Sequence, residues 1–191
     1  MTRDEILDSA VQIFSQKGYH ATSMQDIAQA VKLQKASLYH HIHSKQEILV
    51  AVLDRALDLL IENIQEVTLL PLPPDVKLQQ AVEVYLKVML VNRDLAAVLL
   101  LEHRSLDPQL KEQHIPRRDR FERLWRDLIQ EGMDQEVFVC QDSALAARAL
   151  LGMMNWSITW FRPDGSLSPR QLSDQFSDLF LKGVIPRNHN Q

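Results

Sequence analysis

The chain contains one cysteine, five glycines and no long apolar run. The single thiol, Cys140, excludes an internal disulfide and most cysteine-based metal sites, and it is typical of a reducing compartment. Acids at Asp4 and Glu5 stand where a signal peptide would be apolar. The longest uncharged stretch of the C-terminal half covers residues 149–161, shorter than the about 20 residues that span a bilayer. We therefore expect a cytoplasmic protein with no membrane segment.

The sequence also lacks an excess of positive charge. Its 21 Lys and Arg residues against 25 Asp and Glu residues give a net charge of −4 at pH 7. This balance argues against a protein that coats nucleic acid with its whole surface, but it leaves room for a local basic site. The 191 residues, 46% of them hydrophobic, are enough to bury a core without disulfides.

Glycine is scarce, and apolar residues recur at helical spacing over long stretches. Together these features predict an all-α protein of about nine helices. Thr2 with Glu5, and Ser44 with Glu47, have the spacing of a helix-starting capping box. The second box opens a long helix, which the proline-rich residues 70–74 end.

Prolines and glycines also divide the second half of the chain. A helix begins after Asp107, and Pro116 is expected to break or kink it before the apolar stripe that ends at Gly132. The helix predicted over residues 142–161 is apolar nearly all round, and a last helix covers residues 168–183.

Residues 22–47 carry the clearest functional signal. Two short helices, the second over residues 34–40, meet at a tight turn, and a long capped helix follows. This is the layout of a helix-turn-helix domain, whose second helix enters the major groove of DNA. Residues 31–46 contain no acid, and their three lysines are Lys32, Lys35 and Lys45. These lysines either face DNA phosphates or form an ordinary solvated surface.

Three runs of this segment resemble the N-terminal domain of the TetR family of bacterial transcriptional repressors: TSMQDIA at 22–28, ASLYHHI at 36–42 and SKQEIL at 44–49. The sequence departs from the family pattern at three places. Lys32 stands at a turn position where the family usually has glycine, and a left-handed backbone there would cost about 1 kcal/mol. Gln34 replaces the usual Ser or Thr cap, and Ile42-His43 replaces Phe-Pro.

The resemblance implies a DNA-binding domain over residues 1–48 and a ligand-binding and dimerisation domain over residues 49–191. We expect the hydroxyl side chains, together with Lys45 and Tyr39, to bind DNA phosphates. Side chains at the start of the second short helix suit base edges. The candidate DNA-binding residues are Thr22, Lys32, Gln34, Lys35, Ala36, Ser37, Tyr39, His40 and Lys45.

His40, His41 and His43 permit a different interpretation, in which the protein is a small helical enzyme or binds a metal. Adjacent residues on a helix point about 100° apart, so these rings rarely converge on one ion. The sequence shows no array of a nucleophile and a base. We therefore expect no catalytic residue, no metal and no cofactor.

One short reading helix contacts few bases, so specificity requires two copies on a palindromic operator. The apolar helix over residues 142–161 and the face that carries Phe176 are the best surface for a homodimer, and the family usually dimerises through its last two helices. The alternative is that the apolar helix is simply central in the fold.

Signals for a ligand are weaker. Residues 117–126 contain five arginines and two acids, and arginine forks suit phosphates, although a solvated helix with pairs such as Glu122–Arg126 is an equally ordinary explanation. The aromatic and other apolar residues of this half have two explanations: they line a ligand pocket, or they are part of the ordinary core. The candidate ligand-binding residues are Tyr85, Met89, Arg104, Arg120, Trp125, Arg148, Asn155, Trp156 and Trp160.

A second, looser resemblance lies in the C-terminal half. EHRSL at 102–106, RDRFE at 118–122 and NWSITWFRPDG at 155–165 are similar to the TetR regulators of fatty-acid, steroid or aromatic-acid degradation. That resemblance implies a repressor released by an acyl-coenzyme A thioester. The alternative is the same scaffold sensing an aromatic or cationic drug, as in efflux regulators.

Overall fold

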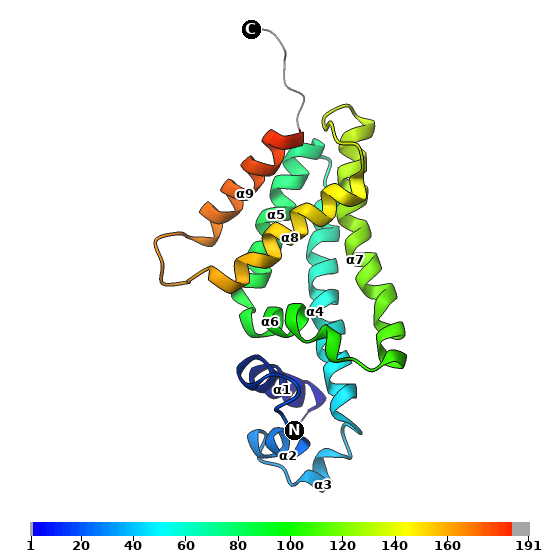
Figure 1. Ribbon diagram of the computed structural model, residues 1–191, viewed down its shortest axis with the longest axis vertical. Helices are drawn as coiled ribbons and strands as arrows, with labels where there is room; N and C mark the ends of the chain where they lie inside the picture. The colour runs from blue at the N-terminus through cyan, green and yellow to red at the C-terminus, as the bar shows by residue number, and fades with distance from the viewer. Residues whose placement is uncertain (1, 185–191) are drawn as a thin grey trace. The chain divides into compact units, whose positions relative to one another are not determined.

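The computed structural model describes residues 2–184, and every regular element among them is a helix (Figure 1). The prediction of an all-α protein is confirmed. The elements are α1 (Arg3–Lys17), α2 (Met24–Ala30), α3 (Lys35–Leu38), α4 (Lys45–Thr68), α5 (Pro74–Val91), α6 (Arg93–Leu101), the 3₁₀ helix η1 (His103–Ser105), α7 (Pro108–Asp134), α8 (Ser143–Trp160) and α9 (Pro169–Val184). None of the helices over residues 2–184 is long and apolar enough to cross a membrane.

The helices form two compact units. The first comprises the chain up to Leu59 together with Asn92–Arg118, and the second comprises Leu60–Val91 together with the chain from Asp119 onward. Helices α4 and α7 each contribute residues to both units. A functional division at residue 48 stays a prediction, since the first unit extends beyond it and takes in a second segment.

In the first unit, α1 packs against α2 and α6 (Figure 1). Its inward stripe includes Ile6, Ala10 and Phe14, all with at most 1% of their surface exposed. The capping box predicted at its start is present, because Thr2 accepts from the Glu5 backbone N–H and Glu5 accepts from that of Thr2. The predicted α-helix therefore has both its cap and its buried face.

Several helix starts differ from the prediction by one or a few residues. Ser23, not Thr22, caps α2, because Asp26 three residues on completes a reciprocal capping box with it. Helix α3 is confined to four residues, and α6 ends at Leu101, after which the chain tightens into η1. Helix α5 begins at Pro74, where the fixed φ of proline suits a first turn.

Pro116 does not break α7, which runs on through it. A proline inside a helix costs about 3 kcal/mol, so packing must offset that loss. The flanking side chains supply it: His114 is buried with its ring nitrogen 2.7 Å from Asp54 of α4, and Arg117 pairs with Asp54 and Asp58. These contacts hold both sides of the proline on one neighbouring helix.

Helix α7 ends at Asp134, two residues beyond the predicted Gly132. The backbone N–H groups of Val137 and Phe138 donate to the Gly132 carbonyl at 2.8 and 2.9 Å. The ring of Phe138 also covers Gly132 so closely that a Cβ added there would lie 2.1 Å from the ring. Gly132 is therefore required for this close approach, not as the last helical residue.

In the second unit, α9 lies along α5, and α8 packs against both (Figure 1). Asp142, where the helix was expected to begin, is its N-cap and accepts from the backbone N–H groups of Ala144 and Leu145. The predicted turn at residues 162–165 closes with the Gly165 N–H donating to the Arg162 carbonyl at 3.0 Å. The core of this unit includes Tyr85 of α5 and Trp125 of α7.

Candidate functional site

The turn between α2 and α3 has a left-handed backbone at Lys32, whose φ is 56°, at the position where the TetR pattern usually has glycine. The Lys32 N–H donates to the Gln29 carbonyl at 3.1 Å, and the Leu33 N–H donates to the Ala28 carbonyl at 2.8 Å. Ile27 and Leu38 are fully buried beneath the two helices. The turn is thus closed by backbone bonds and held by packing on either side.

Most of the predicted DNA-binding residues lie on one exposed stretch around α3. Lys32, Gln34, Lys35, Ala36, Tyr39 and His40 are exposed, and Ser37 is half-buried. Gln34 occupies the N-cap position, yet its side chain makes no capping bond, so its amide is free to bind a base. This arrangement can present two cations, an amide and a phenol to a DNA groove.

Thr22 and Lys45 differ from the rest of the predicted set. The Lys45 ammonium donates to the carbonyls of Tyr19 (2.8 Å) and Thr22 (2.5 Å) and lies 4.2 Å from the centre of the Tyr19 ring. Thr22 is 2% exposed and donates its hydroxyl to the Gly18 carbonyl. Both residues therefore fasten the first turn of α4 to the α1–α2 turn, and a phosphate contact by either stays a prediction.

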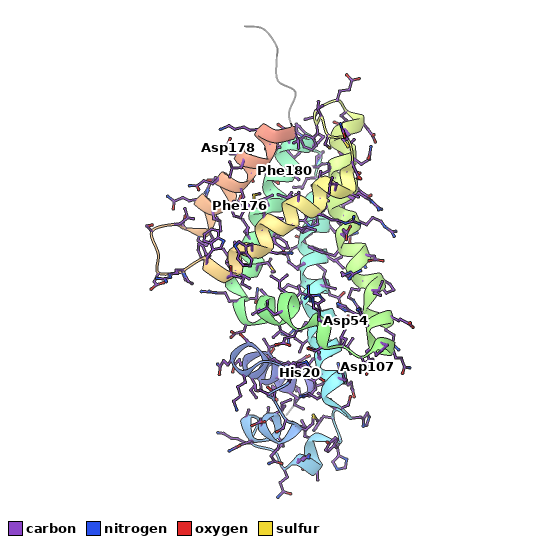
Figure 2. The ribbon with its side chains drawn as sticks, in the orientation of Figure 1. His20, Asp54, Asp107, Phe176, Asp178 and Phe180 are labelled. Carbon is purple, nitrogen blue, oxygen red and sulfur yellow. The ribbon has the colours of Figure 1, made fainter. Side chains whose placement is uncertain are left out.

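A hydrogen-bonded connection that the sequence did not reveal joins the 3₁₀ helix η1 to this domain. Glu102 accepts from the Tyr19 backbone N–H at 3.2 Å, and the Ser105 hydroxyl lies 3.1 Å from the ring nitrogen of His20. The side chain of Gln46 donates to the Ser105 carbonyl and accepts from the Asp107 N–H. Figure 2 labels His20 and Asp107. Motif reasoning missed these bonds because their partners are 59 to 85 residues apart in the chain.

The arginines of the ligand prediction are divided between the two units. Arg104 and Arg117 belong to the first unit, where Arg104 adds positive charge beside His103; burial, followed by this charge, lowers the pKa of His103. In the second unit, Arg120 donates to Gln65 at 3.1 Å, and Arg148 of α8 pairs with Glu122 at 3.0 Å. Glu122 thus pairs with Arg148 of α8, whereas the alternative explanation of the arginine cluster paired it with Arg126 of its own helix.

An aromatic cluster with one polar pair lies in the core of the second unit. The ring of Tyr85 stacks on Phe121 at 5.9 Å and meets Trp125 edge-on at 5.7 Å. The Tyr85 hydroxyl donates to the side-chain carbonyl of Asn155, and burial raises the pKa of Tyr85. Met89, one turn further along α5, is also buried. The structure therefore brings together Tyr85, Trp125 and Asn155, and it adds Phe121, which sequence reasoning had not selected.

Trp156 and Trp160 lie outside this cluster, 67% and 44% exposed. The exposed positions of α8 include Leu145, Ala149, Gly152 and Trp156, which recur at helical spacing, and the charged Arg148 is exposed beside them. On α9, Leu179 is 64% exposed and Phe176, labelled in Figure 2, is half-buried. The ring of Phe176 lies 6.3 Å from that of Trp160. The described parts of α8 and α9 thus leave an apolar face uncovered.

Comparison with known proteins agrees with this architecture. Residues 6–52 match the family described as bacterial regulatory proteins, tetR family, and residues 71–184 match the tetracyclin repressor-like, C-terminal domain. The chain belongs to the TetR family. It is therefore a transcriptional repressor with an N-terminal helix-turn-helix domain.

Several members of the TetR family resemble this chain over nearly their whole length. The TetR-family regulator PfmR from Thermus thermophilus is 38% identical, with a TM-score of 0.86, and the match covers 94% of this chain and 98% of that one. The repressor KstR2 of Mycobacterium tuberculosis is 27% identical over 95% of this chain and 92% of its own. AibR, solved in complex with isovaleryl coenzyme A and operator DNA, is 27% identical, with a TM-score of 0.82, over 97% of this chain and 99% of its own.

Proposed function

We propose that this TetR-family protein is a cytoplasmic homodimeric repressor that binds a palindromic operator and is released by an acyl-coenzyme A thioester. The family supplies the DNA-binding part of this proposal. Support for the effector comes from AibR, which was solved with isovaleryl coenzyme A, and from KstR2, described as a ketosteroid transcriptional regulator. The observation that carries it is the hydrogen-bonded pair of buried Tyr85 and half-buried Asn155 beside an otherwise aromatic cluster.

The DNA contacts come from the exposed stretch around α3. Lys32 and Lys35 bind phosphates or guanine edges, and Gln34 binds adenine. Tyr39, 40% exposed, donates to a phosphate and packs its ring on a sugar. Because Lys45 and Thr22 already hold the domain together, we expect their removal to lower the stability of the domain more than it lowers specificity.

Dimerisation uses the uncovered face of α8 and α9. An exposed Trp156 is rare on a monomer, and Ala149 and Gly152 beside it let a partner helix approach closely. A second copy covers this face by two-fold symmetry, since the same patch on both subunits is complementary to itself. The two reading helices then lie on the two halves of a palindrome.

The effector binds in the second unit, with its acyl chain against the aromatic cluster and its phosphates near Arg120 and Arg148. Both arginines are exposed, and their side chains contact Gln65 and Glu122 respectively, so an incoming phosphate competes with one partner at each guanidinium. Release requires the effector to bind more tightly to a state of the dimer that does not fit the operator. The bonds of Glu102 to Tyr19 and of Ser105 to Gln46 couple residues 102–105 to the DNA-binding domain, so we expect a change in this segment to alter that domain.

The enzyme interpretation has less support. His40, His41 and His43 are all exposed around the end of α3, and the described residues contain no group of three or more His, Cys, Asp or Glu side chains placed to hold a metal ion. The relatives are transcriptional regulators, not enzymes. We propose that the three histidines belong to the DNA-binding surface.

The decisive experiment has two arms. In the first, the affinity for a fragment of the protein's own promoter is measured for Lys35→Ala and Tyr39→Phe against the exposed control Lys182→Ala on α9. In the second, the melting temperature is followed with acyl-coenzyme A esters, free acids and cationic drugs. We expect weaker DNA binding by the first two variants only, and a rise in melting temperature with thioesters. A rise with cationic drugs alone would instead support the efflux-regulator alternative.

A further inference from the structure

The indole N–H of Trp125 is a buried donor without a partner. Trp125 has 0% of its surface exposed, and no acceptor among the described residues lies within hydrogen-bond distance of Nε1. Leaving such a donor unsatisfied costs the desolvation energy of the group, so buried donors in native proteins nearly always have a partner. An unsatisfied donor in the core of the second unit therefore requires an explanation.

The surroundings of this indole make it selective for one kind of partner. Its ring neighbours are Tyr85 and Phe121, with centres 5.7 and 6.5 Å away, and a ring face is only a weak acceptor. The hydroxyl hydrogen of Tyr85 is already used, because it donates to Asn155, so Tyr85 offers a ligand no further donor. A ligand that enters this cluster therefore meets apolar walls and one strong donor at Trp125.

The amide of Asn155 is oriented by the same contact. Because Tyr85 donates to its side-chain oxygen, the NH₂ group of Asn155 is the end that remains for a second acceptor, and Asn155 is half-buried. The cluster thus offers two donors that a ligand can use, the Trp125 N–H and the NH₂ group of Asn155. A carbonyl oxygen attached to an apolar chain is an acceptor that suits these donors.

We propose that Trp125 Nε1 donates a hydrogen bond to the thioester carbonyl of the effector, and that this bond makes the repressor respond to acyl esters rather than to coenzyme A or alkyl compounds. This inference rests on the proposed function, since it names the atom by which the proposed effector is recognised. The carbonyl oxygen gives the buried indole N–H the acceptor that the described residues of the protein do not supply.

The test compares acyl-coenzyme A thioesters with S-alkyl-coenzyme A thioethers of equal chain length, which lack only the carbonyl oxygen. We expect wild-type protein to bind the thioester about tenfold more tightly. Trp125→Phe, which keeps a ring but removes the N–H, should bind the two ligands equally. The matched control is Phe138→Leu, another buried aromatic of the second unit, which should keep the tenfold preference.

Each outcome of this titration has a distinct meaning. No preference in the wild type, or a preference that persists in Trp125→Phe, would overturn the carbonyl bond while leaving the effector proposal intact. Binding of neither ligand series would overturn the effector and the bond together. If Trp125→Phe does not fold, the indole N–H signal of Trp125 in ¹⁵N-labelled wild-type protein decides: it should move downfield with the thioester and not with the thioether, and an unchanged signal would overturn the proposal.

Discussion

Replacing Lys32 with glycine should stabilise the protein and weaken DNA binding at the same time. Lys32 has a φ of 56°, a conformation that brings the Cβ of any L-residue close to the following carbonyl oxygen and costs about 1 kcal/mol. Glycine has no Cβ and adopts this backbone readily, so Lys32→Gly should raise the free energy of unfolding by about 1 kcal/mol. For a chain of this size, the melting temperature should rise by about 2–4 °C.

The matched control is Lys32→Ala, which removes the same charge but keeps the Cβ. Both variants lose one cation per subunit, which is two per dimer. The slope of the logarithm of DNA affinity against the logarithm of salt concentration should therefore decrease in magnitude by about two in each variant. Urea unfolding of the full chain then gives the free energy of unfolding of both variants. The difference between Lys32→Gly and Lys32→Ala is the effect of the backbone conformation alone. Equal stability of the two variants would refute the left-handed turn, and unchanged salt dependence would refute the phosphate contact.

Three further predictions concern other parts of the chain. Gly132→Ala forces its new Cβ to within 2.1 Å of the Phe138 ring and should cost about 1–3 kcal/mol of stability in urea unfolding, whereas Gly183→Ala, which meets nothing within 4 Å, should cost none; equal effects would contradict the close approach. Burial lowers the pKa of His103, so the folded state resists its protonation and the free energy of unfolding should fall as pH drops below about 6.5. In His103→Gln, the free energy of unfolding measured in urea should depend less on pH over this range, and an unchanged pH dependence would count against that burial. Trp156→Asp should shift the protein from dimer to monomer in analytical ultracentrifugation, and a persistent dimer would move the interface elsewhere.

Local rules predicted much of the fold because the helix starts depend on neighbouring residues. The caps at Thr2 and Asp142 and the start of α9 after Ser168 follow from side chains within three residues of each cap. The same rules could not decide between a break and a kink at Pro116, because the anchoring of His114 and Arg117 on α4 depends on residues 60 and 59 positions away. Helix α2 also follows local rules, since Ser23 and not its neighbour Thr22 has the reciprocal capping partner Asp26.

The candidate sites were predicted unevenly, also for physical reasons. The residues around α3 could be found because exposure of a short helix after a tight turn follows from the motif. The internal role of Lys45 could not, since its acceptors are backbone carbonyls that no sequence pattern marks. Trp125 and Trp156 look alike in sequence, yet one is fully buried and the other 67% exposed, and only the packing of the second unit distinguishes them.

The central claim is that an acyl-coenzyme A thioester releases this repressor from its operator. The most direct measurement titrates the complex of the dimer with a fluorescent fragment of its own promoter, using an acyl-coenzyme A series, coenzyme A and the free acids, and follows fluorescence anisotropy. The account predicts that a thioester returns the anisotropy to that of free DNA, while coenzyme A and the free acids leave the complex intact. A complex that persists with every thioester at saturating concentration would contradict it.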